Sequence, residues 1–324
     1  MKKFWMVLSA IVVAASLYAA NAMAAGTVTV YSPSPAGLAD KIAAGFEAKY
    51  DIKVEQFQGT TGNILARLEA EAANPVADVV ILASWSDGLS YAAQDMVADY
   101  TPANADKLVD GWFDGKLVGY SASAISVIYN TTIFPELSAD WDELADPMYQ
   151  DELVMPDPEL SGSCKDFISG YIDAFGEEGW MTWEALADNG MTIPGANKAA
   201  LAAVTTGEKG ILVAGVDYNA YSAIAKGEPL ALYYPEGGTV VNPRPAMILK
   251  TAPNMDNAKL YMDYLLSDEV QQMVVDAYLL AGRTDFSYDN RATIDAIPLF
   301  DYDWSEMMEI SDDCAAQLIA LCAE

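Results

Sequence analysis

The 324-residue chain contains no histidine and few basic residues. Lysine and arginine together number 17, against 47 aspartates and glutamates, which gives a formal net charge of -30. Without histidine, the chain cannot form a Ser-His-Asp or Cys-His catalytic site, an imidazole zinc site or a histidine pH switch. Its negative charge is repelled by phosphate backbones and by anionic lipid surfaces. We therefore expect no nucleic-acid partner and no electrostatic docking to a membrane.

The N-terminal segment has the pattern of a secretory signal peptide. Lys2 and Lys3 precede an apolar stretch over residues 4–20, and Ala22-Met23-Ala24 is a small-x-small cleavage motif. These features predict a signal peptide over residues 1–24, cleaved before Ala25, and a periplasmic protein. An uncleaved anchor is the alternative. No later apolar run approaches the roughly 18 residues that a membrane span needs.

Only three cysteines are present, Cys164, Cys314 and Cys322. In an oxidising compartment, Cys314 and Cys322 can pair and leave Cys164 free. A disulfide from Cys164 to the C-terminal segment is the competing arrangement. None of the three shows the two-residue spacing of a zinc ribbon, so we expect no bound metal and no cofactor.

Hydrophobic residues make up 52% of the chain, enough for a large core, and the length suggests two lobes. The first part alternates strands with helices, which predicts an open α/β sheet with parallel pairing. Strands are expected at 27–31, 53–57 and 78–82, and helices follow the first two. Ser34 is expected to cap the first helix, with Pro35 as its first residue. In such sheets ligands bind beyond the carboxyl ends of the strands.

The pattern changes after residue 116. Two strands are expected at 117–120 and 124–129, separated by Ser121-Ala122-Ser123, and a second α/β set follows. Two prolines forbid a helix at 240–245 and predict an extended crossing back to the first lobe. Other expected elements are helices near 141–144, 165–175, 198–205, 217–225 and 256–266, and strands at 210–214, 229–234 and 246–249.

Six short segments, taken in order, resemble the type II periplasmic solute-binding proteins of ABC importers. The nearest branch binds ferric iron, hexose phosphates or 2-aminoethylphosphonate, and the resemblance covers nearly the whole mature chain. The segments are Thr27 to Tyr31, Gln58-Gly59-Thr60-Thr61-Gly62, Ala77-Asp78-Val79-Val80, Ile128-Tyr129-Asn130-Thr131, Gly215-Val216-Asp217-Tyr218 and Pro243-Arg244-Pro245-Ala246.

The resemblance implies a two-lobed α/β fold of periplasmic binding protein type II. Each lobe is an open mixed sheet flanked by helices, and two crossing segments join the lobes. Lobe 1 would comprise residues 25–120 and 246–324, and lobe 2 residues 121–245. The implied function is capture of a small-molecule ligand between the lobes by hinge closure, and delivery to an ABC permease in the inner membrane. We expect a monomer that performs no catalysis.

The starts of helices in the first lobe offer uncharged donors for an anion. Helix N-termini supply free backbone N–H groups and a partial positive charge, so they hold a phosphate or carboxylate without lysine. Ordinary capping is the alternative explanation for these hydroxyl groups. The predicted first-lobe ligand residues are Ser32, Ser34, Thr60, Thr61, Gly62 and Ser84.

The second lobe adds charged and aromatic candidates. The resemblance implies that the turn with Ser161 and Ser163 contacts ligand, with Lys165 as a counter-charge. Arg244 can fork onto an oxyanion, and Tyr221 can line the pocket. Asp217 and Glu236 are acceptors for hydroxyl or ammonium groups. Either carboxylate can equally be a cap or a solvated loop charge. Together these residues favour a sugar phosphate or phosphonate.

Other ligands and functions remain open at this level. Ferric-iron binders of the branch have a histidine after the first strand and a tyrosine pair where this chain has Val216-Asp217, and both features are missing. Tyr218, Tyr221 and Glu236 still leave iron as an alternative. A polyamine or thiamine would suit the negative charge. An exported hydrolase with two carboxylates and a ligand-sensing receptor subunit are further alternatives.

Overall fold

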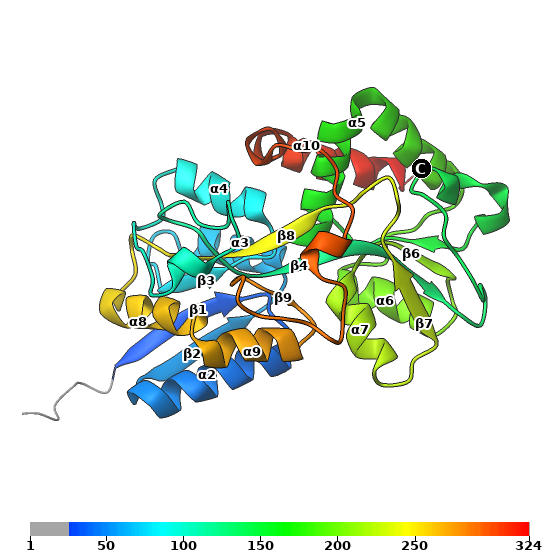
Figure 1. Ribbon diagram of the computed structural model, residues 1–324. Coiled ribbons are helices and arrows are strands. Elements are labelled where there is room, and N and C mark those ends of the chain that lie inside the picture. The colour runs from blue at the N-terminus through cyan, green and yellow to red at the C-terminus, as the bar shows by residue number, and fades with distance from the viewer. Residues whose placement is uncertain (1–25, 324) are drawn as a thin grey trace, which may run out of the picture.

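The computed structural model describes residues 26–323, and they form two lobes that lie side by side (Figure 1). The predicted signal peptide and its cleavage site before Ala25 lie outside these residues. Strands follow the order β2-β1-β3-β8-β4-β6-β5, with β7 and β9 also paired to β4. The predicted α/β class is confirmed. None of the helices described within residues 26–323 combines the length and the apolar composition that a membrane span requires.

The first lobe is built on parallel strands whose carboxyl ends each lead into a helix. β1 (Thr27–Ser32) pairs in parallel with β2 (Lys53–Gln58) and with β3 (Val79–Ile81). A helix follows the first strand as predicted, and its residues Leu38, Ile42 and Phe46, four positions apart, are buried in one core. The helices of this lobe are α2 (Ala36–Tyr50), α3 (Thr61–Ala70), α4 (Trp85–Ala93), α8 (Met255–Leu265) and α9 (Asp268–Asp276).

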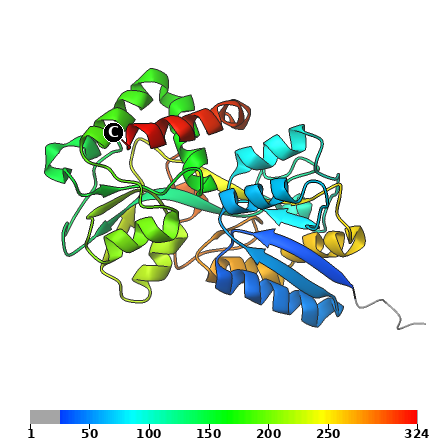
Figure 2. The same ribbon diagram turned by 180° about the vertical axis from the view of Figure 1, so that it is seen from behind.

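Two long antiparallel strands cross between the lobes. β4 (Val118–Asn130) is one continuous strand, so the prediction of two strands separated by Ser121-Ala122-Ser123 is wrong. The serines interrupt the apolar pattern, yet they pair with β8 (Val241–Ile248) and β9 (Leu280–Ala281). Residues 118–124 of β4 pair with β8, and residues 125–130 pair with β6 and β7. β4 therefore belongs to the sheets of both lobes, and β8 runs beside its first half, paired with β3 and β4. Figure 2 shows the two lobes from behind.

β8 tolerates its two prolines because of its position. The carbonyl oxygen of Pro245 accepts a hydrogen bond from the backbone N–H of Leu82 at 3.0 Å. The nitrogen of a strand residue points to the same side as its carbonyl, here toward β3, whose pairing with β8 begins only at Ala246. The missing N–H of Pro245 therefore falls at the end of the β3–β8 ladder and removes no bond to β4.

The second lobe packs its own sheet and helices around a separate apolar core. A three-residue 3-10 helix, Glu143–Ala145, stands where a helix near 141–144 was expected. Gly176, with φ +56°, kinks the long α5. The elements are β5 (Leu153–Val154), β6 (Ile211–Val216), β7 (Leu230–Tyr233), α5 (Gly162–Asp188), α6 (Asn197–Thr205) and α7 (Asp217–Ile224). Other 3-10 turns are Ala105–Lys107, Pro147–Tyr149 and Ile294–Ala296.

The C-terminal helix α10 (Trp304–Leu321) packs mainly along α5 and also contacts α4 (Figure 1). Its buried residues Cys314 and Leu318 belong to the core of the second lobe. The predicted division into 25–120 with 246–324 and 121–245 stays a prediction, and α10 lies against the lobe formed by the middle segment.

The cysteine prediction is wrong. Cys314 lies within α10 and Cys322 caps its end, so the rise of about 1.5 Å per residue separates them by about 12 Å. A disulfide requires Cα atoms less than about 7 Å apart. Cys164 is also free, and its thiol donates to the carbonyl oxygen of Pro156 at 3.2 Å. Burial raises the pKa of the Cys314 thiol to about 12, which keeps it unreactive.

Candidate functional site

A cavity of about 210 Å³ lies where the two lobes meet. Five of the predicted ligand residues line it, two from the first lobe, two from α5 and its cap, and one from the crossing strand β8. These are Thr60, Thr61, Ser161, Ser163 and Arg244. The other lining residues are Pro33, Gly59, Ala83, Leu160, Gly162, Ala196, Asn197, Lys198, Tyr218 and Asn219.

The start of α3 forms the first-lobe wall. Thr60 is the N-cap, and its Oγ1 accepts a hydrogen bond from the backbone N–H of Asn63 at 3.2 Å. Thr61 is buried, and its Oγ1 accepts from the backbone N–H of Ala83 at 3.0 Å. Both hydroxyl oxygens therefore accept from the protein and keep their hydrogens for another acceptor.

The start of α5 forms the opposite wall. Ser161 caps this helix, and its Oγ accepts from the backbone N–H of Cys164 at 3.3 Å. Asn197, the first residue of α6, donates from Nδ2 to the same oxygen at 2.8 Å. Ser163 lies 3.4 Å from Ser161, oxygen to oxygen. The first residues of α3, α5 and α6 thus all line one cavity.

Arg244 supplies a buried positive charge. Its side chain is 1% exposed, and Nη2 donates to the carbonyl oxygen of Pro33 at 3.0 Å. The guanidinium carbon lies 5.7 Å from the ring centre of Tyr218. Nε is buried and has no hydrogen-bond partner. An unpartnered donor on a buried guanidinium is costly, so this group needs an acceptor.

The sequence reasoning missed Asn197, Lys198 and Asn219, and singled out Tyr218 only for iron. Lys198 is exposed at the second position of α6, and Asn219 is the third residue of α7. Their location at the starts of predicted helices was the available signal. Among the described residues that line the cavity, Arg244 and Lys198 are the cations, and none is a carboxylate.

Ser32 and Ser34 do not line the cavity, although Pro33 between them does. The expected cap is wrong, because Pro35 occupies the N-cap position of α2 and no side chain caps that helix. Ser34 Oγ instead lies 2.7 Å from the hydroxyl of Tyr120, and Ser32 Oγ donates to Ser34 Oγ at 2.8 Å. This buried pair shapes the turn that carries Pro33.

Gly62 and Lys165 line a second cavity between the lobes, of about 660 Å³, and Ser84 lies at a contact between the lobes. The backbone N–H of Gly62 donates to the carbonyl oxygen of Leu160 at 3.4 Å. Lys165 Nζ donates to Asp87 at 2.5 Å and to Asp312 at 3.0 Å. Burial lowers the pKa of Lys165, but the two carboxylates outweigh it and raise the pKa above its ordinary value. The lysine is already neutralised and is not available to a ligand in this arrangement.

Asp217, Tyr221 and Glu236 also lie away from the cavity. Asp217 is fully buried and accepts from Arg291 Nη2 at 2.5 Å and from the Tyr234 hydroxyl at 2.9 Å. Burial raises the pKa of Asp217, against the lowering effect of Arg291. The Tyr221 hydroxyl lies 3.4 Å from that of Tyr234, and Glu236 is exposed. The structure does not bring these three residues to the cavity.

Comparison with known proteins decides the family. The model of the bacterial extracellular solute-binding protein family matches residues 74–309. The chain belongs to this family. The predicted resemblance to solute-binding proteins is therefore confirmed, and the family consists of binding proteins, not enzymes.

Several known proteins are similar to this solute-binding protein. Iron uptake protein A1 of Synechocystis sp. is 27% identical over 75% of this chain and 72% of its own length. A putative 2-aminoethylphosphonate-binding periplasmic protein of Salmonella typhimurium is 25% identical over 80% of this chain and 79% of its own length. The structure of AfuA from Actinobacillus pleuropneumoniae, with exogenous fructose-6-phosphate bound, matches with a TM-score of 0.84 at 21% identity, over 92% of this chain and 99% of that one.

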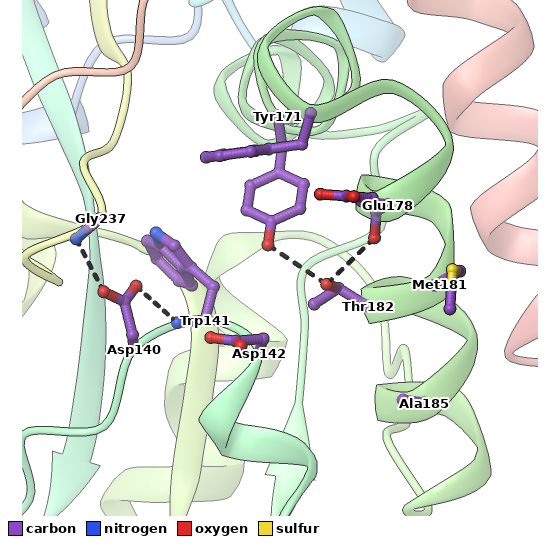
Figure 3. A pocket seen from close by; sticks show the side chains of 10 residues that line it. Asp140, Trp141, Asp142, Tyr171, Glu178, Met181, Thr182, Ala185 and Gly237 are labelled. Carbon is purple, nitrogen blue, oxygen red and sulfur yellow. Dashed lines mark hydrogen bonds between the residues drawn. The ribbon is translucent and has the colours of Figure 1, made fainter.

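A larger cavity of about 600 Å³ lies in the second lobe of the solute-binding protein and contains none of the predicted ligand residues (Figure 3). Asp140 accepts there from the backbone N–H groups of Trp141 and Gly237. The Tyr171 hydroxyl donates to Thr182. Within residues 26–323 no group of three or more histidine, cysteine, aspartate or glutamate side chains is placed to hold a metal ion.

Proposed function

We propose that this chain is the periplasmic solute-binding component of an ABC importer and that it captures a small anionic metabolite, a sugar phosphate or a phosphonate. One observation carries the proposal. The cavity between the starts of α3 and α5 is lined by two cations and, among the described residues, by no carboxylate, in a chain with 47 acidic residues. A cavity lined by cations and by no carboxylate, in a protein so rich in carboxylates, is suited to an anion.

The donors around the cavity match an oxyanion. The guanidinium of Arg244 lines the cavity, and a guanidinium forms short, charge-assisted hydrogen bonds to phosphate oxygens. Thr60, Ser161 and Ser163 add hydroxyl groups, and helix N-termini add partial positive charge. The volume of about 210 Å³ lies below the roughly 300–1,000 Å³ of drug-sized pockets, which favours a small metabolite.

The proposed mechanism is hinge closure. Donors from both lobes contact the ligand together only when the lobes are close, so the ligand binds the closed form more tightly and increases its population. The flexible part would be the long strand β4, since it pairs within the sheets of both lobes. Delivery to an inner-membrane permease follows from the family resemblance.

Ferric iron is the second candidate. The similarity to iron uptake protein A1 and the phenol of Tyr218 in the cavity support it. Hard ferric iron binds best to phenolate, carboxylate and imidazole groups. The described lining offers one phenol, no carboxylate and no imidazole, so we rank an anion above a metal ion.

Isothermal titration of the purified protein tests this ranking. The probes are fructose 6-phosphate, glucose 6-phosphate, 2-aminoethylphosphonate, ferric citrate, trisodium citrate and spermidine. We expect binding of at least one phosphorus compound, weakened at least tenfold in Arg244→Gln and Lys198→Gln. The control Lys226→Gln removes an exposed positive charge just after α7 and should bind as the wild type does. Heat from ferric citrate or spermidine alone would contradict the proposal.

A further inference from the structure

The start of α4 is already occupied by a carboxylate from the opposite lobe. Ser84 caps this helix and donates from Oγ to Oδ1 of Asp166 in α5 at 2.7 Å. The backbone N–H of Trp85, the first residue of α4, donates to Oδ2 of Asp166 at 2.8 Å. Asp166 and Ser84 are both fully buried. The position at which a bound anion would sit on a helix is therefore filled from within the protein.

The backbones on either side of this contact are also close. A Cβ atom on Gly162 would lie 2.9 Å from the side chains of Ser84 and Thr61. A Cβ atom on Gly62 would lie 2.2 Å from the carbonyl oxygen of Glu159. Glycine at both positions lets the start of α5 approach the starts of α3 and α4 directly. The contact of Asp166 thus adjoins the hydroxyl groups that line the cavity.

Charged groups surround Asp166 on each element that packs against it. Asp87 faces it from α4, Lys165 precedes it in α5, Asp312 reaches Lys165 from α10, and Tyr302 lies in the segment before α10. Lys165 in α5 forms an ion pair with Asp87 in α4. The same two helices are therefore joined twice, by a cation of α5 bound to α4 and by a carboxyl group of α5 bound to the start of α4. The two links connect residues 78 to 82 positions apart in the chain.

We propose that Asp166 is a positioning residue, a buried carboxyl group that occupies the start of α4 and stabilises the closed arrangement of the lobes before a solute binds, so that a solute adds to a closed population already present. The consequence is that Thr61 and Ser161 face each other across a formed cavity before a ligand arrives. A solute would then be held by the starts of α3, α5 and α6, because the start of α4 is already satisfied. The proposal goes beyond the proposed function and does not depend on which solute is bound.

Small-angle X-ray scattering of the ligand-free protein tests it. We expect the wild-type curve to match that calculated from residues 26–323 as shown in Figure 1. Asp166→Ala and Ser84→Ala should both increase the radius of gyration while the far-ultraviolet circular dichroism spectrum stays unchanged. Ser84→Ala removes one partner from the other lobe, so it keeps the test valid if Asp166→Ala does not fold.

Asp78→Ala is the matched control. Asp78 is also fully buried, and it accepts from the backbone N–H groups of Thr29 at 2.7 Å and Asn254 at 2.6 Å, both in the first lobe. This variant should lower the melting temperature without changing the radius of gyration. Folded Asp166→Ala and Ser84→Ala proteins as compact as the wild type would overturn the proposal, as would a wild type that fits only a more open form. The compactness of the ligand-free protein does not depend on which solute it binds, so these results leave the proposed function to its own test.

Discussion

Arg291 and Asp217 form a fully buried ion pair, with 2.5 Å between Nη2 and Oδ2. Arg291 lies in the segment between β9 and α10, and Asp217 is the first residue of α7. Arg291 Nη1 also donates to the carbonyl oxygen of Tyr278 at 2.6 Å. The pair fixes the start of α7, and the next two residues, Tyr218 and Asn219, line the cavity.

Breaking this pair should strongly destabilise the fold. Arg291→Met leaves the Asp217 carboxylate buried without its cation, and such losses cost about 3–5 kcal/mol. Urea denaturation monitored by tryptophan fluorescence measures the free energy of unfolding. The double variant Arg291→Met with Asp217→Leu should recover much of the loss, because no uncompensated charge remains. A single variant within about 0.5 kcal/mol of the wild type would show that the pair is not structural.

Asp166 should make the stability depend on pH. Burial, then the negative charge of Asp87, raises the pKa of Asp166 to about 7 in the folded protein, from an ordinary value of 3.8. Between pH 3.8 and about pH 7, Asp166 is therefore protonated in the folded protein and ionised in the unfolded chain. The contribution to stability is present below pH 4 and is lost as the pH rises toward 7, at most about 1.4 kcal/mol for each pH unit.

The measurement is urea denaturation of the wild type and Asp166→Asn from pH 5 to pH 8. No histidine titrates in this window, so the difference between the two proteins isolates Asp166. We expect the wild type to lose stability relative to Asp166→Asn as the pH rises to about 7, and the difference to level off above it. A difference that is constant from pH 5 to pH 8 would contradict the assigned pKa.

The close approach at Gly162 predicts a sensitive position. Gly162→Ala would place a methyl group 2.9 Å from Ser84 and Thr61. Overpacking of this kind typically lowers the free energy of unfolding by about 1–3 kcal/mol. To make room for the methyl group, the start of α5 would move away from Ser84 and Thr61. This movement would separate the two cavity walls and weaken ligand binding. Gly37→Ala is the control, since a Cβ atom there meets nothing within 4 Å and alanine favours the helix. Thermal unfolding should show a decrease only for Gly162→Ala.

The free thiols give a further prediction. Because Cys164, Cys314 and Cys322 are unpaired, a reducing agent should not change the melting temperature. Alkylation after unfolding in denaturant should modify all three cysteines, as intact-mass spectrometry would show. Protection of any two of them without reductant would indicate a disulfide that the structure lacks.

The sequence was most informative where structure depends on local patterns. The strands and helices of the first lobe follow from apolar periodicity, and Thr60 at a helix start follows from capping chemistry. Arg244 could be singled out because it stands between two prolines in an extended segment. These residues do line the cavity.

Long-range partners could not be predicted in the same way. Ser84 and Lys165 looked like ligand residues because their partners, Asp166 and Asp87, lie in the opposite lobe. Asp217 likewise depends on Arg291, 74 positions further along the chain. Lys198 enters the cavity only because α6 begins beside Ser161, a placement that no local pattern specifies.

Calorimetric titration of the wild type and Arg244→Gln with fructose 6-phosphate and 2-aminoethylphosphonate tests the central claim most directly. The account predicts that the wild type binds at least one of these anions and that Arg244→Gln, folded by circular dichroism, binds it at least tenfold more weakly. Equal affinity in the two proteins, or binding of ferric citrate with no response to either phosphorus compound, would contradict it.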